Sequence, residues 1–185
     1  MVKLIIGVVG NRNSGKTTTT SNITDTLVIK GFKVAIIKFL RHKFDLDPTH
    51  KDSALLRKTK ATTIISTSPH EIVLFQNTDK QTDLQTLIYY LPPDTNVIIC
   101  ESYPSKFPRI PLIFVCRNTE DFFETKERYN NQKPLFITGF ISNQNIDALE
   151  GIPVLSNKIN QIEKAIELIM QIYEPLNRTH KKNLV

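Results

Sequence analysis

Short apolar runs alternate with longer amphipathic segments along the chain, which predicts a sheet covered by helices. The run over residues 3–9 (KLIIGVV) is rich in β-branched residues and is typical of a buried strand. Residues 17–30 carry apolar side chains at helical spacing, and Gly31 provides a stop for that helix. A second strand is expected over 33–39 (KVAIIKF). Strand, helix and strand in this order form the unit from which a parallel sheet is built.

The rest of the chain continues this alternation with one exception. Two strand-like runs, 61–67 and 71–76, are joined at Ser68-Pro69, and a connection this short predicts an antiparallel hairpin. The other expected elements are helices over 52–60, 82–91, 119–130 and 158–173, and strands over 96–102, 111–117, 134–140 and near 153–155. We therefore predict an α/β three-layer sandwich with a mostly parallel sheet. One domain is expected over residues 1–175, followed by a basic tail over 176–185.

The composition is that of an ordinary soluble globular protein. Hydrophobic residues make up 40% and charged residues 23% of the chain. No apolar run approaches the ~18 residues of a membrane span, so no membrane association is expected. Cys100 and Cys116 lie within apolar runs and lack metal-ligand spacing, which predicts buried free thiols and a cytoplasmic location.

The net charge of +6 and the pI of about 9.3 point to an acidic partner. The basic residues are scattered, however, and no motif combining aromatic and basic residues accompanies them. We therefore expect an anionic small molecule or an acidic protein as the partner, and no nucleic acid.

The stretch from Gly10 to Thr17 reads G-x-x-x-x-G-K-T, the phosphate-binding P-loop pattern, and it lies between a predicted strand and a predicted helix. Its glycines let the backbone curl so that N–H groups point at phosphate oxygens. Lys16 is expected to act in catalysis by reaching the β- and γ-phosphates, and the Thr17 hydroxyl to bind Mg²⁺. The residues expected to hold the nucleotide here are Gly10, Asn11, Arg12, Asn13, Ser14, Gly15, Lys16, Thr17 and Thr18.

Charged residues follow two other predicted strands, at the sheet edge where α/β proteins bind ligands. Glu101 ends an apolar strand and is expected to face Mg²⁺ or its water. Lys38 ends another strand and opens a charged loop that includes Asp47, Lys51 and Asp52. Carboxylates suit Mg²⁺ and lysines suit phosphates. We expect Asp47 to bind the metal, Asp52 to act in catalysis, and Lys38 and Lys51 to bind an anion, with this loop closing over the ligand.

The segment from Asn118 to Asp121 (NTED) has two interpretations. Guanine-binding proteins often carry N-K-x-D after a strand, and here the spacing is present but the lysine is absent. Asn118 and Asp121 would then bind the guanine base. Alternatively, Asn118 or Thr119 caps the next helix, with acidic residues in its first turn. Both functions can coexist.

Three segments together resemble the MobB family, small P-loop proteins of molybdenum-cofactor biosynthesis. They are the P-loop GNRNSGKTTTT, the loop IKFLRHKFDLDPTHKDSALLRKTKA and the strand IICESYPSKFPRIPLIFV, and the resemblance covers roughly residues 3 to 115. The family pattern E-G-F-K corresponds to Glu101, Ser102, Tyr103 and Pro104, so only the glutamate is kept and Ser102 replaces the glycine. Phe39 and Arg41 replace family histidines. The chain is thus similar to a divergent member of the family.

The resemblance implies a GTP-binding protein with weak Mg²⁺-dependent GTPase activity that assists in attaching GMP to molybdopterin. It also implies a homodimer and a nucleotidyltransferase or other molybdenum-cofactor protein as partner, with molybdopterin as a second ligand. The residues themselves indicate Mg-nucleotide binding and leave GTP and ATP open, although ATP is less favoured. A small-molecule kinase or ATP-dependent ligase, and a non-catalytic nucleotide-sensing adaptor, are the alternative functions.

Overall fold

The computed structural model of the protein describes residues 3–40, 61–76, 82–156 and 158–182, together with Leu56, Thr59 and Thr78. The chain divides into two compact units, residues 1–39 with 88–185 and residues 40–87. The helix expected over 52–60 lies outside the described residues. The single domain expected over 1–175 stays a prediction.

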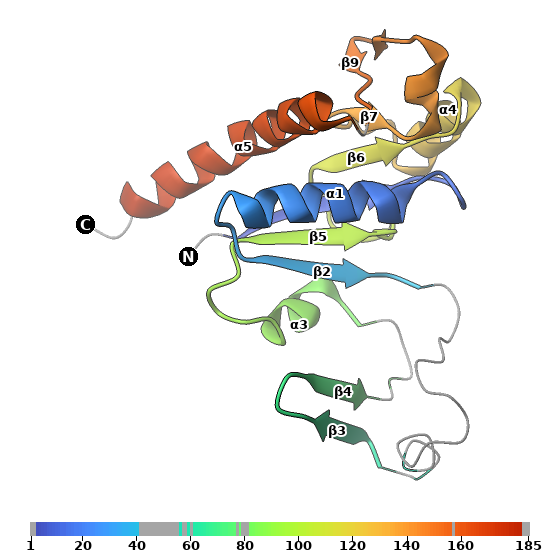
Figure 1. Ribbon diagram of the computed structural model, residues 1–185. Coiled ribbons are helices and arrows are strands. Elements are labelled where there is room, and N and C mark those ends of the chain that lie inside the picture. The colour runs from blue at the N-terminus through green and yellow to red at the C-terminus, as the bar shows by residue number, and fades with distance from the viewer. Residues whose placement is uncertain are drawn as a thin grey trace. The chain divides into compact units, whose positions relative to one another are not determined.

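A five-stranded parallel sheet forms the centre of the larger unit (Figure 1). Its order is β2-β5-β1-β6-β7, so the first strand lies in the middle and the chain crosses to either side of it. All four strand pairings are parallel, which confirms the predicted sheet type. The strands are β1 (Leu4–Val9), β2 (Val34–Lys38), β5 (Val97–Glu101), β6 (Leu112–Val115) and β7 (Ile137–Thr138).

Helices cover both faces of this sheet. Alternate residues of β1, namely Leu4, Ile6 and Val8, belong to one buried cluster with residues of α1 (Lys16–Ile29) and α5 (Ile159–Lys182). On the opposite face, Phe114 of β6 packs against Phe122 of α4 (Thr119–Arg128), with ring centroids 6.1 Å apart. The period of two along the strands thus sends successive side chains to two different helical layers. The predicted three-layer arrangement is confirmed.

Predicted elements differ from the structure at their ends, most of all β7 and α5. The strand expected over 134–140 contains only Ile137 and Thr138, because Gly139 (φ 99°, ψ −156°) turns the chain into the 3-10 helix η1 (Phe140–Gln144). A small hairpin of β8 (Ala148–Leu149) and β9 (Ile152–Pro153) follows. The last helix was expected to end at residue 173 but continues to Lys182.

The second unit contains an antiparallel hairpin of β3 (Thr63–Thr67) and β4 (Ile72–Gln76), as predicted. The Ser68 hydroxyl oxygen accepts hydrogen bonds from the backbone N–H groups of His70 and Glu71, which fixes the turn. The helix α3 (Leu84–Tyr89) follows the hairpin in the chain. It is shorter than the helix expected over 82–91 and ends before Pro92.

Both cysteines are buried free thiols, as the sequence predicts. Burial raises the pKa of Cys100 and of Cys116 to about 12. The thiols therefore stay protonated at neutral pH and pack as small apolar side chains.

Gly139 lies where a side chain has no room. A Cβ at this position would be 2.6 Å from the carbonyl oxygen of Cys116 and 2.9 Å from that of Ser14 in the P-loop. Gly31 offers a matched comparison, because its φ is also positive (86°) but nothing lies within 4 Å of its virtual Cβ.

We expect Gly31→Ala to lower the free energy of unfolding by about 1 kcal/mol, the cost of a left-handed conformation for a residue with a Cβ. Gly139→Ala should cost about 1–3 kcal/mol more, because two backbone carbonyls must also move. Urea denaturation of the two variants measures the difference. Equal losses in both variants would contradict the close packing behind the P-loop.

Candidate functional site

The loop between β1 and α1 has the backbone conformation of a phosphate-binding cradle. Gly10 (φ 156°), Asn13 (φ 59°) and Gly15 (φ 99°) bend it, and Gly15 is the N-cap of α1. A Cβ on Gly10 would lie 2.0 Å from the carbonyl oxygen of Val115, so only glycine fits there. When left- and right-handed backbone conformations alternate before a helix, the backbone N–H groups point into a concavity that suits anions. The structure thus gives the predicted P-loop the geometry that its sequence requires.

Two P-loop side chains engage groups within the site. The Lys16 ammonium donates a hydrogen bond to the carbonyl oxygen of Asn11, at 2.6 Å. The Thr17 hydroxyl donates to Oε1 of Glu101, at 3.0 Å. Ser14 is fully buried, and its hydroxyl has no hydrogen-bond partner among the residues that the structure describes. Thr18, Arg12 and Asn13 are exposed.

Glu101 and Lys38 emerge side by side at the carboxyl ends of neighbouring strands. They are paired in the parallel register of β2 and β5, and the Lys38 ammonium lies 2.9 Å from Glu101 Oε1. The Glu101 side chain is only 5% exposed, whereas that of Lys38 is 48% exposed. A carboxylate this buried requires a compensating charge or hydrogen bonds, and it obtains both, from Lys38 and Thr17. The structure thus brings Lys38, Thr17 and Glu101 together at one edge of the sheet; their predicted roles stay predictions.

A hydroxyl next to a carboxylate, beside a phosphate-binding loop, is the oxygen donor set that Mg²⁺ uses in P-loop proteins. Thr17 and Glu101 fit this description by chemistry and separation. In the described part of the chain, no group of three or more His, Cys, Asp or Glu residues is placed to hold a metal ion by itself.

Asn118 caps helix α4, as one of the two interpretations predicted. Its Oδ1 accepts a hydrogen bond from the backbone N–H of Asp121, at 2.9 Å, and Glu120 and Asp121 occupy the first turn.

The Asp121 carboxylate is buried and fully engaged. Arg117 donates to Oδ2 from Nε and to Oδ1 from its guanidinium NH2, each at 2.6 Å, and the Arg117 backbone N–H donates to Oδ2 at 3.0 Å. Because Arg117 hydrogen-bonds it, the pKa of Asp121 lies well below its ordinary value. Guanine recognition by Asp121 stays a prediction, and it would require the base to replace one of these donors.

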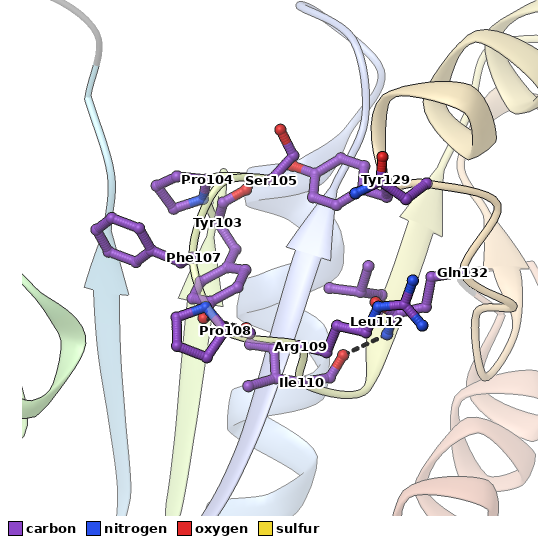
Figure 2. A pocket seen from close by; sticks show the side chains of 11 residues that line it. Tyr103, Pro104, Ser105, Phe107, Pro108, Arg109, Ile110, Leu112, Tyr129 and Gln132 are labelled. Carbon is purple, nitrogen blue, oxygen red and sulfur yellow. Dashed lines mark hydrogen bonds between the residues drawn. The ribbon is translucent and has the colours of Figure 1, made fainter.

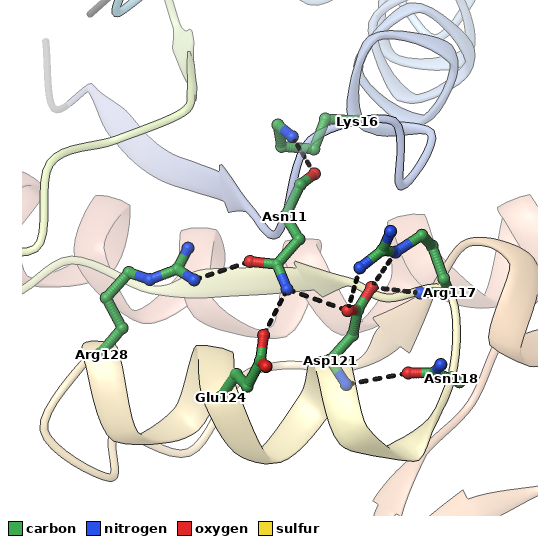
Figure 3. Close-up of polar contacts among 7 residues, drawn as sticks. All are labelled: Asn11, Lys16, Arg117, Asn118, Asp121, Glu124 and Arg128. Carbon is green, nitrogen blue, oxygen red and sulfur yellow. Dashed lines mark hydrogen bonds and ion pairs between the residues drawn. The ribbon is translucent and has the colours of Figure 1, made fainter.

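Asn11 joins this network from the P-loop, as Figure 3 shows. Its amide nitrogen donates to Asp121 Oδ1 at 2.9 Å and to Glu124 Oε2 at 2.7 Å, and its oxygen accepts from Arg128 at 2.6 Å. The sequence analysis missed the polar residues Arg117, Glu124 and Arg128. Together with Asp121 they are spaced by three or four residues, which is the spacing of neighbours on one side of a helix. This spacing could have grouped them in the sequence.

The segment after Glu101 is packed rather than open. Phe39, Tyr103 and Phe107 form three edge-to-face ring pairs at 5.6 to 5.8 Å, so the phenylalanine that replaces a family histidine has aromatic neighbours. A cavity of about 20 Å³ lies between this segment and the end of α4 (Figure 2), and it holds about one water molecule. Tyr103 and Gln132 at its wall donate to the carbonyls of Pro108 and Ile110. This cavity is a small gap between packed side chains and is too small for a nucleotide.

Ser102 replaces the glycine of the family pattern, yet it keeps a glycine-like backbone. Its φ is 58°, in the left-handed region, and its N–H donates to the carbonyl of Val8 at 2.8 Å. The other predicted site residues, Asp47, Lys51 and Asp52, lie outside the described residues.

Within the ranges that the structure describes, no helix is both long enough and apolar enough to cross a membrane.

Among curated proteins, none matches the chain. Several solved structures have the same fold. A molybdopterin-guanine biosynthesis protein B aligns with a TM-score of 0.67 and 20% identity, over 91% of this chain and 99% of its own. Bacillus subtilis MobB aligns with a TM-score of 0.66 and 20% identity, over 89% and 97%.

A MobB protein homolog from Bacillus stearothermophilus has a TM-score of 0.63 and 17% identity, over 92% of this chain and 98% of its own. These likenesses confirm the α/β P-loop fold. The model of the family "Molybdopterin guanine dinucleotide synthesis protein B" matches residues 5–139, well over half of the chain. The central parallel sheet, the P-loop and Glu101 all fall within that match, and the chain belongs to the MobB family.

Proposed function

We propose that this protein binds Mg-GTP and assists the synthesis of molybdopterin guanine dinucleotide in the cytoplasm. The observation that carries the proposal is the Thr17–Glu101 contact beside a glycine-bent P-loop, in a chain of the MobB family. The contact unites a metal-binding hydroxyl and a carboxylate from segments 84 residues apart.

Each group in the site has a distinct task in this proposal. The loop backbone from Gly10 to Lys16 holds the phosphates, and the Lys16 ammonium leaves the Asn11 carbonyl to bind the β- and γ-oxygens. Thr17 and Glu101 hold Mg²⁺, which would neutralise charge on the phosphates when bound. Lys38 pairs with Glu101 and orients its carboxylate. Asp47, Asp52 and Lys51 would complete the metal surroundings and meet a second anion, such as the phosphate of molybdopterin.

Turnover is expected to be slow and to depend on a nucleotidyltransferase partner. Rapid hydrolysis needs a group that positions the attacking water. Glu101 is the acidic residue next to Thr17, but it is paired with Lys38 and is proposed to hold the metal. An adaptor role, in which GTP binding changes affinity for the partner, fits this arrangement.

Homodimerisation is the second part of the proposal, and the β3–β4 hairpin supports it. Ile65 pairs with Leu74 and Thr67 with Ile72 across the strands, so the three apolar residues share one face. Their exposed fractions are 63%, 44% and 76%. Exposed apolar faces commonly mark interaction sites, and this one would be covered by the same face of a second copy.

Lys16→Ala should lower the affinity for Mg-GTP at least tenfold and leave the fold unchanged. The ammonium makes charge-assisted contacts with phosphate that are worth about 1.5–3 kcal/mol or more. Isothermal calorimetry measures the change, and Lys30→Ala, an exposed lysine after the other end of α1, is the control. Unchanged affinity in a folded Lys16 variant would remove the nucleotide site.

Glu101→Gln should weaken binding of Mg-GTP by roughly ten- to a hundredfold, the loss of one charge-assisted metal or hydrogen-bond contact. Binding of GTP in EDTA should hardly change, since the side chain is proposed to act through the metal. Calorimetry in both buffers gives the comparison, with the exposed Glu163→Gln as control. An equal loss with and without Mg²⁺ would show that Glu101 serves the fold and not the metal.

Leu74→Glu should shift the protein from dimer to monomer, because a carboxylate cannot be buried unpaired against the partner hairpin. Sedimentation velocity across a concentration series measures the shift. His70→Glu in the exposed turn adds the same charge outside the apolar face and should leave the dimer intact. A wild-type protein that stays monomeric at all concentrations would exclude this interface.

A further inference from the structure

The Asn11 side chain of the P-loop contacts three residues of α4. An asparagine amide has two N–H donors and a carbonyl acceptor. Here the nitrogen donates to two carboxylates, those of Asp121 and Glu124, and the oxygen accepts from Arg128 (Figure 3). Acidic groups of α4 thus face the amide nitrogen, and a basic group faces the amide oxygen. An aspartate would face two carboxylates, and an aliphatic residue would leave them without these donors.

The main chain of the same residue supports the catalytic lysine. The Asn11 carbonyl oxygen accepts from Lys16 at 2.6 Å. Its neighbour Gly10 is packed against the Val115 carbonyl. Asn11 therefore has a fixed backbone on one side and a side chain anchored to α4 on the other. Movement of α4 would be transmitted to the loop through this residue.

The three contacts differ in strength. The Asp121 side chain is 3% exposed and paired with Arg117, and hydrogen bonds to a buried ionised group are strong. The contact with Glu124 is exposed to solvent, where water and salt weaken it. The Arg128 contact with the Asn11 oxygen, at 2.6 Å, is part-buried and also charge-assisted. Asp121 therefore anchors the Asn11 nitrogen and Arg128 its oxygen.

We propose that Asn11 is a positioning residue, which clamps the P-loop to Asp121 of α4 and thereby sets the affinity of the loop for phosphate groups. This inference rests on the proposed nucleotide site. A loop held in shape before ligand arrives loses less conformational entropy on binding. Since the clamp acts on the phosphate cradle, its loss weakens GTP and ATP alike. Asp121 then acts through Asn11, which differs from direct recognition of guanine.

The test reverses the polarity of the hydrogen bond. Asn11→Asp places two carboxylates in contact, whereas the double variant Asn11→Asp/Asp121→Asn restores a donor and an acceptor with unchanged net charge. Each variant is compared by calorimetry with Mg-GTP and Mg-ATP, and by hydrogen exchange of the amides of residues 10–16 without nucleotide. Asn143→Asp on η1, an exposed position, is the matched control. Asn11→Ser, which shortens the side chain without adding charge, replaces Asn11→Asp if the latter does not fold.

We expect Asn11→Asp to accelerate exchange in the nucleotide-free loop and to raise the Kd for both nucleotides about tenfold, the equivalent of one lost charge-assisted hydrogen bond. The double variant should recover most of the nucleotide affinity and most of the protection from exchange. A defect confined to residue 11 would not be repaired by a change at residue 121.

Unchanged exchange and affinity in Asn11→Asp would overturn the proposal. So would a loss confined to GTP that the double variant does not restore, since Asp121 would then recognise the base. If the wild-type protein binds neither nucleotide, the proposed function fails, and the exchange measurements alone decide whether the clamp exists.

Discussion

The close approach of backbones at the carboxyl ends of β1, β6 and β7 is the constraint on which the site depends. The P-loop follows β1 and lies against the Val115 carbonyl at Gly10, while Gly139 after β7 lies against the carbonyls of Cys116 and Ser14. Neither position has room for a Cβ. The parallel order of the sheet brings these strand ends together, so the shape of the phosphate cradle is set by the sheet behind it.

Two buried carboxylates flank this cradle, and each is matched by a cation. Glu101 is paired with Lys38 on one side, and Asp121 with Arg117 on the other. In both pairs the acid is almost fully buried and the base about half exposed. The two carboxylates are therefore fixed by their surroundings, whereas the Lys38 and Arg117 side chains have room to move. The positive charges of these two pairs thus lie on the solvent side of the carboxylates.

Local patterns made much of the fold predictable. Alternating strand and helix signals, the P-loop letters and the Asn118 cap all depend on residues close in sequence, and the structure bears them out. The contacts of Asn11 with α4 span more than 100 residues, so no local pattern contains them. The strand β7 was too long in the prediction because Gly139 ends it by a backbone turn that apolar periodicity does not record.

Ser102 has the left-handed backbone that favours glycine, a conformation that costs about 1 kcal/mol or more for a residue with a Cβ. The strain lies directly after Glu101, at the strand end where Lys38 and Thr17 meet that carboxylate. Such a conformation persists only where the surrounding structure fixes it, and here the Ser102 N–H donates to the carbonyl of Val8. The strand end that positions the acidic residue is therefore also a place where the fold stores conformational energy.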